Sequence, residues 1–88
     1  MKIIFKEQFV KQVDKLVDKK LKSEILEIVS KIEIYKSAAE IRNIKKLKGY
    51  KDFHRIRIGD YRIGIKIENE TVTFAAFHHR KDIYKHFP

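Results

Sequence analysis

The sequence contains no cysteine and no tryptophan, and it has only one proline and three glycines. Without cysteine the chain cannot form a disulfide framework or a thiolate nucleophile, which agrees with a reducing, cytoplasmic environment. No apolar run approaches the roughly 18 residues that a membrane-spanning helix needs, and the apolar start of the chain is too short for a signal peptide. We therefore expect a cytoplasmic protein without a membrane partner.

Acidic side chains are few compared with basic ones. Lys and Arg number 21 against 12 Asp and Glu, which gives a net charge of +9. Residues 1–43 carry 10 basic and 7 acidic side chains, whereas residues 44–88 carry 11 and 5, so the excess lies mostly in the second half. This excess of positive charge predicts an acidic partner, such as nucleic acid or an acidic protein. Its 88 residues predict one domain over residues 1–88.

The clearest structural pattern lies between residues 53 and 68, where isoleucines alternate with charged residues on both sides of Gly59-Asp60. This alternation predicts two half-buried strands, and the Gly-Asp pair predicts a tight hairpin between them. One face of the hairpin is then apolar, and the other carries four cations: Arg55, Arg57, Arg62 and Lys66. A solvated face and a polyanion site both fit the pattern, and the arginine fork suits phosphate.

The first half of the chain predicts one strand followed by two helices. A β-branched run at residues 2–5 is typical of a strand. Apolar residues at helical spacing predict helices over residues 7–18 and 22–35, and their short connection implies antiparallel packing.

The segment between the helices and the hairpin is predicted to be helical at its start. Ser37 and Glu40 have the spacing of a capping box. We expect them to begin a short helical turn that carries Ile41 and Ile44, after which the basic residues 45–49 lead into the hairpin.

Residues 71–77 are apolar on both faces and predict a central strand, and a last turn over residues 83–87 is expected to pack back on the sheet. The predicted fold class is therefore α+β with the order β-α-α-β-β-β. An N-terminal helical hairpin would pack on one face of a small, mainly antiparallel sheet. The face with the arginines would be left open.

Three motifs follow one another in the second half of the chain: Leu47-Lys48-Gly49, the basic strand that ends in Gly59-Asp60-Tyr61-Arg62, and His79-Arg80-Lys81-Asp82-Ile83-Tyr84. Together they resemble the RelE/ParE toxin superfamily of bacterial and archaeal toxin–antitoxin systems. The resemblance covers the whole chain, since the early strand, the helices and the β-meander follow in the same order. It implies a toxin with a RelE/ParE-like fold and a cognate acidic antitoxin, part of which folds as it binds.

RelE-type members of this superfamily cut mRNA in the ribosomal A site without a metal or cofactor. Attack of a 2′-hydroxyl on the adjacent phosphate leaves a cyclic phosphate and a 5′-hydroxyl. The resemblance places their basic cluster on Arg55, Arg57, Arg62 and Arg80, and their C-terminal tyrosine on Tyr84 if one gap is allowed. Arginine at the first two positions departs from the lysines of the best-known RelE. It fits electrostatic stabilisation, because arginine is a poor base.

Such a reaction also needs groups that exchange protons. The candidates are Tyr84 and the histidines His54, His79 and His78, in that order of preference; some superfamily members use a histidine at the position of His54. Strand parity predicts His78 and Arg80 on one side of the sheet and His79 on the other. No His-x-x-x-His or cysteine pair is present, so the sequence predicts no zinc site.

We expect RNA to contact the lysines around this cluster, which are Lys45, Lys46, Lys48, Lys51, Lys66 and Lys81. The partners of such an endoribonuclease would be mRNA, the ribosome and the antitoxin. ParE-type members, which poison DNA gyrase, generally lack the complete basic set, so its presence favours RNA cleavage. Gyrase inhibition, or an inactive member that only binds its antitoxin, remain the alternatives.

Overall fold

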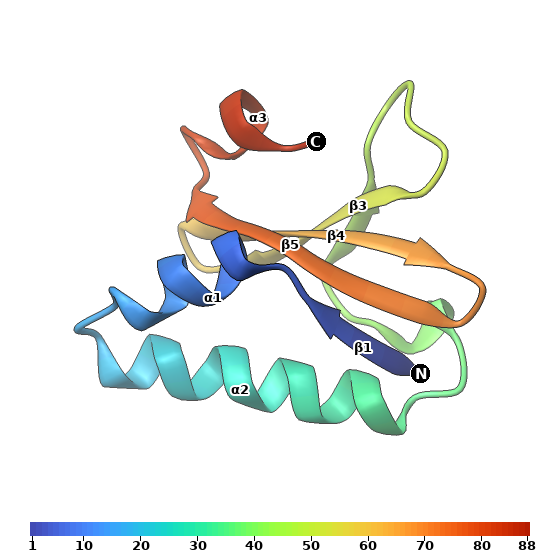
Figure 1. Ribbon diagram of the computed structural model, residues 1–88, viewed down its shortest axis with the longest axis horizontal. Coiled ribbons are helices and arrows are strands. Elements are labelled where there is room, and N and C mark those ends of the chain that lie inside the picture. Colours follow the sequence, from blue (N-terminus) through green and yellow to red (C-terminus); the bar gives the residue numbers. More distant parts are fainter.

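A five-stranded sheet with helices on both sides forms the computed structural model, which describes residues 1–88 (Figure 1). Its elements follow the order β1 (Lys2–Phe5), α1 (Glu7–Asp14), α2 (Lys19–Ile34), a 3-10 helix η1 (Ala38–Glu40), β2 (Ile44–Lys46), β3 (Phe53–Ile58), β4 (Tyr61–Glu68), β5 (Thr71–His79) and α3 (Ile83–His86). The predicted α+β class is confirmed. No helix of the chain is both long and apolar enough to cross a membrane.

The sheet has the strand order β1-β5-β4-β3-β2. β1 pairs in parallel with β5, and the other neighbours are antiparallel. The predicted hairpin is confirmed, because Ile58 pairs with Tyr61 across a two-residue turn in which Gly59 has φ +59°. Glycine adopts this left-handed conformation at little cost.

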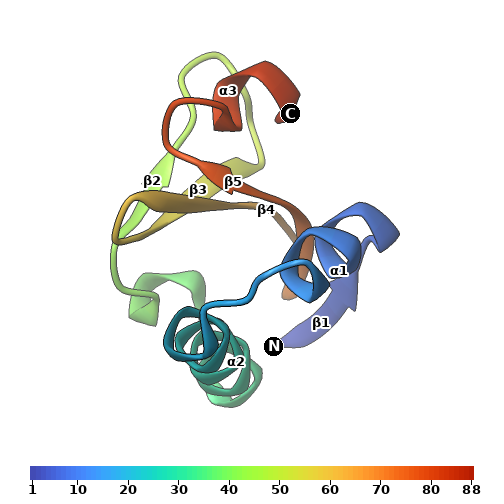
Figure 2. The same ribbon diagram turned by 90° about the vertical axis from the view of Figure 1, so that its left-hand side faces the viewer.

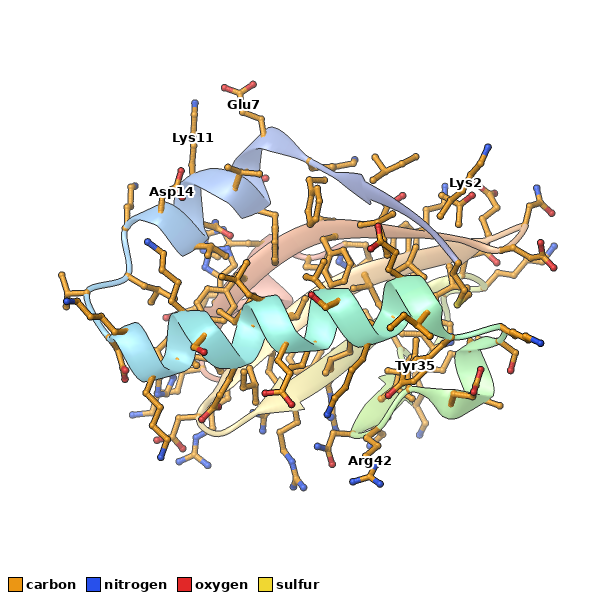
Figure 3. The ribbon with its side chains drawn as sticks, turned by 90° about the horizontal axis from the view of Figure 1, so that it is seen from below. Lys2, Glu7, Lys11, Asp14, Tyr35 and Arg42 are labelled. Atoms are coloured by element: carbon orange, nitrogen blue, oxygen red, sulfur yellow. The ribbon has the colours of Figure 1, made fainter.

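One face of the sheet, which we call the helix face, carries the main hydrophobic core beneath α1 and α2. Phe74 is completely buried there and packs against Phe9 of α1, with ring centroids 5.3 Å apart. The two helices run in roughly opposite directions (Figure 1), and Glu7 and Lys11 of α1 point away from the sheet (Figure 3). Isoleucines from β3 and β4 complete this core: Ile56, Ile58, Ile63 and Ile65.

The helix boundaries differ from the predicted ones. α1 ends at Asp14 rather than at residue 18, and α2 begins at Lys19 rather than at residue 22. Val17, one of the apolar residues whose helical spacing predicted a helix over residues 7–18, is 95% exposed in the connection. Asp18 caps α2 instead, since its side chain accepts a hydrogen bond of 3.0 Å from the backbone N–H of Leu21. Aspartate is a favoured N-cap because it satisfies a free N–H of the first turn.

The predicted helical turn at residues 37–44 is only partly right. Ser37 and Glu40 form the expected capping box around η1, but Ile44 lies in the strand β2, which the sequence analysis did not predict. β2 pairs with β3 so that Lys45 faces Arg55. β2 is an edge strand, and its two lysines interrupt the apolar alternation by which a strand is recognised in a sequence. Charged side chains are common on edge strands, because they prevent pairing with the strands of another molecule.

The opposite face, which we call the arginine face, carries Arg55, Arg57 and Arg62 and is only partly open. α3 lies over it, on the other side of the sheet from α2 (Figure 2). Ile83 and Phe87 are buried there in a second apolar cluster with Leu47 and Ala76. The predicted last turn is therefore confirmed, but the expectation of a fully open face is wrong, because this turn covers part of it.

An irregularity in β5 decides which of its side chains reach each face. Gly64 of β4 pairs with Ala76 and Ile65 pairs with Phe74, so Ala75 is an extra residue. Such a bulge shifts the alternation of a strand by one. As a result Phe74 and Phe77 both point to the helix face, although they are three residues apart, and His78 points to the arginine face.

Candidate active site

The four predicted arginines come together on the arginine face. Arg57 pairs with Arg62 across the β3–β4 ladder, and Arg55 lies two residues before Arg57 on the same side. Arg80 follows β5, and its backbone N–H donates a 2.8 Å hydrogen bond to the backbone carbonyl oxygen of Asp60 in the hairpin turn. The charge of Arg80, like those of Arg55 and Arg57, lowers the pKa of Arg62. We call Arg55, Arg57, Arg62 and Arg80 the arginine cluster.

No arginine of the cluster makes an ion pair with an acidic side chain. Partial burial lowers the pKa of Arg62 below its ordinary value, and the charges of Arg55, Arg57 and Arg80 lower it further, whereas Tyr84 acts in the opposite direction. The ion pairs of the chain are all made by lysines. Like charges held this close repel one another, so binding of an anion would be favourable here.

Backbone carbonyl groups hold two of these guanidinium groups in place. Arg62 donates from Nη1 to the carbonyl oxygens of Gly59 and Tyr61, both at 2.9 Å. Arg55 donates from Nη1 to the carbonyl oxygen of Asn43 at 3.2 Å, while its Nε is buried without a hydrogen-bond partner. An unpaired donor on a charged group is uncommon in folded proteins. The hydrogen bonds leave Arg62 oriented before any ligand arrives.

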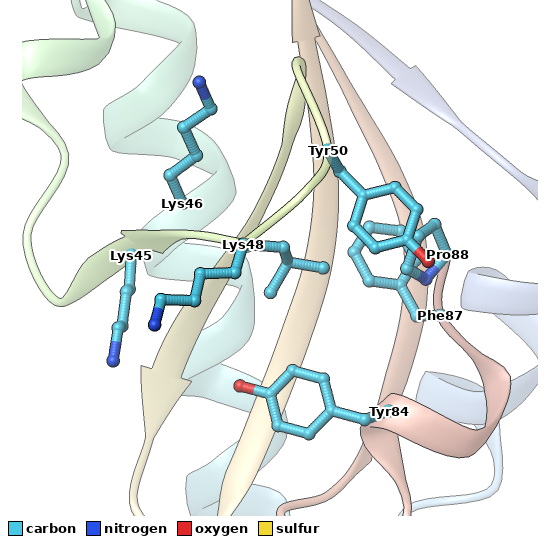
Figure 4. A pocket seen from close by; sticks show the side chains of 8 residues that line it. Lys45, Lys46, Lys48, Tyr50, Tyr84, Phe87 and Pro88 are labelled. Atoms are coloured by element: carbon cyan, nitrogen blue, oxygen red, sulfur yellow. The ribbon is translucent and has the colours of Figure 1, made fainter.

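Tyr84 lies on α3 at the side of the cluster and is 61% exposed. Its ring projects into a pocket of about 590 Å³ between α3 and the β2–β3 connection (Figure 4). No acidic residue lines this pocket; its walls are Lys45, Lys46, Leu47, Lys48, Tyr50, Tyr84, Phe87 and Pro88. The pocket and the arginine cluster adjoin, because Lys45 of the pocket wall pairs with Arg55 across β2 and β3.

The predicted RNA-binding lysines divide into two groups. Lys45, Lys46 and Lys48 line the pocket, although Lys45 and Lys46 point in opposite directions (Figure 4). The other three lie outside it. Lys66 is on the arginine face, where its Nζ lies 3.6 Å from Glu68 and 5.8 Å from the ring centre of Phe53.

Lys51 and Lys81 are exposed in the loops that follow β2 and β5. Both loops leave the sheet next to strands of the cluster, but neither lysine side chain makes an ion pair.

The histidines are not arranged as the preferred candidates require. His54 pairs with Ile65 and His79 pairs with Tyr61, so both point to the helix face, away from the arginines. His79 packs there against the ring of Tyr61. His78, the least preferred of the three histidine candidates, pairs with Arg62 and shares its face. His78 and His79 lie on opposite faces of the sheet, as predicted. The preference for His54 and His79 followed the resemblance rather than this parity, and the geometry does not favour a catalytic role for either.

Two features of the site had not been recognised from the sequence. The ring of Phe87 lies on Gly64 in the middle of the arginine face, where a Cβ atom would come within 2.6 Å of it. A glycine inside a strand often marks such a close approach, which was the available signal. Tyr50, half exposed in the β2–β3 connection, lies edge-on to Phe53 and lines the same pocket as Tyr84.

A metal site is not evident, since no group of three or more His, Asp or Glu side chains is placed to hold an ion.

Comparisons with known proteins agree with this geometry. A family model described as the ParE toxin of type II toxin–antitoxin systems matches residues 3–84. A protein of Methanocaldococcus jannaschii named toxin RelE3 is 39% identical over 89 residues, which is 100% of both chains.

Solved structures resemble the whole fold. A chain of the RelB–RelE antitoxin–toxin complex from Methanococcus jannaschii has a TM-score of 0.82 and 35% identity, covering 97% of this chain and 99% of that one. A chain of the RelE–RelB complex from Pyrococcus horikoshii OT3 has a TM-score of 0.74, covering 93% and 97%; at 23% identity it supports the fold alone.

Proposed function

We propose that this chain, which belongs to the RelE/ParE superfamily of toxins from toxin–antitoxin systems, is a metal-independent endoribonuclease that cleaves mRNA in the ribosomal A site. The observation that carries this proposal is the arginine cluster with Tyr84 beside it. Four cations without acidic partners form a site for a phosphodiester, and the tyrosine adds a group that can exchange a proton.

The reaction is an internal phosphoryl transfer. The 2′-oxygen of one nucleotide bonds to the adjacent phosphorus, and the bond from phosphorus to the 5′-oxygen of the next nucleotide breaks. Negative charge gathers on the two non-bridging oxygens as this happens. Fixed guanidinium groups stabilise that charge without having to reorient, which is how preorganised sites lower a barrier. Arg62 is the best placed, because two carbonyl groups already hold it.

Two protons must move in the same reaction. One leaves the attacking 2′-hydroxyl, and one reaches the departing 5′-oxygen, so that the product carries a 5′-hydroxyl. Arginine cannot take either role at neutral pH. Tyr84 is the exposed titratable group beside the cluster, and we assign it to one of these transfers. His54 and His79 face away from the cluster, so we assign them no part.

The RNA on either side of the cut would follow the basic surface around the cluster. Lys45 pairs with Arg55 in the sheet, so the pocket lysines continue directly from the cluster. Phosphate contacts by lysine are not specific for sequence and depend on salt. Ribosome dependence would follow if this surface binds RNA too weakly on its own.

The antitoxin partner is inferred from charge and from the relatives. Two of the similar structures are complexes of RelE with RelB. The net charge of +9 favours an acidic antitoxin segment that covers the arginine cluster and folds as it binds. Copurification of a small acidic protein encoded by a neighbouring gene would support this partner.

The decisive experiment is induction of the chain in cells, followed by mapping of mRNA 5′ ends. We expect cuts in the reading frame and arrested translation. The Arg62→Ala/Arg80→Ala double variant should lose both effects and remain folded. Arg42→Ala is the matched control, because Arg42 is exposed outside the cluster and should stay fully active. A folded double variant that still cuts mRNA would refute the proposal.

The match to a ParE family model favours one other candidate, inhibition of DNA gyrase. In that case the arginine face is only a solvated surface. Induction would then cause a DNA-damage response without cuts in mRNA, and the double variant would behave like the unmodified chain. If neither response appears, the chain is an inactive member that binds its antitoxin.

A further inference from the structure

The side chain of Gln12 connects α1 to the part of β5 that β1 does not cover. β1 pairs only with Thr71–Phe74, which leaves the later backbone N–H groups of β5 without a strand partner on that side. The Oε1 of Gln12 accepts a hydrogen bond of 2.7 Å from the N–H of Phe77. The amide orientation is therefore fixed, because a backbone N–H can bond only to the oxygen end.

This orientation determines the protonation of His78. With Oε1 on Phe77, the Nε2 of Gln12 lies 2.8 Å from the Nε2 of His78. An amide nitrogen only donates, so the histidine nitrogen must accept and can carry no proton. His78 is therefore neutral, with its proton on Nδ1.

The ring of His78 also contacts α3. It stacks on the ring of His86, with centroids 4.5 Å apart and planes 23° apart. His86 and Tyr84 belong to the single helical turn of α3. Ile83 and Phe87 hold this turn on the sheet, because they are buried in the apolar cluster with Leu47 and Ala76. A contact on His86 therefore limits how this turn can rotate, and with it where the phenol points.

We propose that Gln12 and His78 are positioning residues, which hold α3 so that Tyr84 faces the arginine cluster. Because residue 12 is an amide that donates to His78, they do so only while His78 is neutral. The consequence for cleavage rests on the proposed function. The contacts themselves can be measured without RNA.

Protonation of His78 would break its contact with Gln12, because a proton on Nε2 would face the N–H donors of the amide. The ring would then no longer be held against His86. The ionisable groups that face His78 are Arg62 on β4, His86 on α3 and Asp82 before α3, while α1 offers only the neutral amide. Burial lowers the pKa of His78 below its usual value, His86 lowers it further, and Asp82 opposes them. α3 should therefore loosen below pH 6.5.

The test uses Gln12→Glu in the full chain. A carboxylate can still accept from Phe77, but its second oxygen now requires a proton on the Nε2 of His78. The pKa of His78 should rise by one unit or more, as expected beside an opposite charge. Gln8→Glu is the matched control, since it places the same charge on an exposed position of the same helix.

The first measurement follows the histidine and tyrosine rings by NMR over pH 5 to 8 in the absence of RNA. In the unmodified chain and in Gln8→Glu, we expect His78 to titrate below its usual value, and the Tyr84 resonances to shift with the same midpoint. In Gln12→Glu the midpoint of His78 should rise and the Tyr84 shift should disappear. If Gln12→Glu titrates like the control, or if Tyr84 does not respond in the unmodified chain, the proposal is wrong.

The second measurement is the rate of mRNA cleavage on programmed ribosomes over the same pH range. One pH unit below the midpoint only about a tenth of His78 is neutral in the unmodified chain. Gln12→Glu should therefore cleave about tenfold faster there than the unmodified chain and within about twofold of it at pH 7.5. Equal pH profiles would overturn the proposal. If no variant cleaves RNA, the proposed function fails, and the NMR titration still decides this inference.

Discussion

The two faces of the sheet use neighbouring positions of the same three strands, but one face buries apolar side chains and the other gathers cations. On the helix face, Ile56, Ile63 and Phe77 pair across β3, β4 and β5 and are buried together. One position along, Arg57, Arg62 and His78 pair across the same strands on the arginine face. The first row gains stability from burial, whereas the second brings like charges together and gains only when an anion binds.

The comparison suggests that stability and function can be changed separately in this chain. The strand period of two sends alternate residues to opposite sides, so a change in one row leaves the other row in place. The exception is the centre of the arginine face, where Phe87 on Gly64 makes a small apolar cluster part of the site.

The largest effect is expected on the helix face. Phe74→Ala removes a completely buried ring that packs against Phe5 and Phe9. The free energy of unfolding should fall by about 3–5 kcal/mol, as for other buried phenylalanines. Urea denaturation in an Arg62→Ala background would measure this without growth arrest. Val17→Ala is the control, since Val17 is exposed and its loss should cost less than about 0.5 kcal/mol.

The next effect belongs to the arginine face and should leave stability unchanged. Arg62→Ala removes the guanidinium that two carbonyl groups orient. We expect cleavage to slow by about 10² to 10³, the usual loss when one preorganised donor is removed. The unfolding midpoint should stay equal or rise slightly, because one of four repelling charges is gone. A drop in stability as large as that of Phe74→Ala would remove the distinction between the faces.

Gly64→Ala should affect both properties. Its new Cβ would meet the ring of Phe87 at 2.6 Å, so α3 and Tyr84 must move. We expect the free energy of unfolding to fall by about 1–3 kcal/mol, as in other overpacked sites, and cleavage to slow as well. Adding Phe87→Leu should restore part of both by making space. If the double variant is no better than Gly64→Ala, the position of α3 is not what links the faces.

The fold was predictable from the sequence wherever local pattern and tertiary structure agree. Alternating isoleucines around Gly59-Asp60 indicated two strands, their turn and the side on which the arginines lie. β2 was not predicted, because the sequence around Lys45 and Lys46 shows no alternation of apolar and polar residues. Its pairing with β3 becomes evident only in the folded sheet. Val17 was misleading for the opposite reason, since an apolar residue at helical spacing proved to be exposed.

The site was predictable in its charges but not in its supporting contacts. Arg55, Arg57 and Arg62 follow from strand parity. The parity of His78 was also expected, but its bond to Gln12 joins residues that are 66 positions apart, and no local pattern encodes such a contact. The requirement for glycine at position 64 likewise depends on a distant residue. The ring of Phe87 reaches Gly64 only because the chain turns back over the sheet through α3.

The smallest effect should come from the edge of the site. Tyr50 is half exposed and lines the pocket opposite α3, where a base of single-stranded RNA could stack (Figure 4). Tyr50→Ala should weaken binding of a short, 2′-methoxy RNA about fivefold to tenfold, near the lower limit for stacking on one aromatic ring. Tyr50→Phe keeps the ring and should bind like the unmodified chain, which fluorescence anisotropy would measure. Stability should change little in either variant, because about half of the side chain is already exposed. Equal binding by Tyr50→Ala would confine RNA recognition to the charges of the arginine face, and the aromatic wall of the pocket would then serve only to support α3.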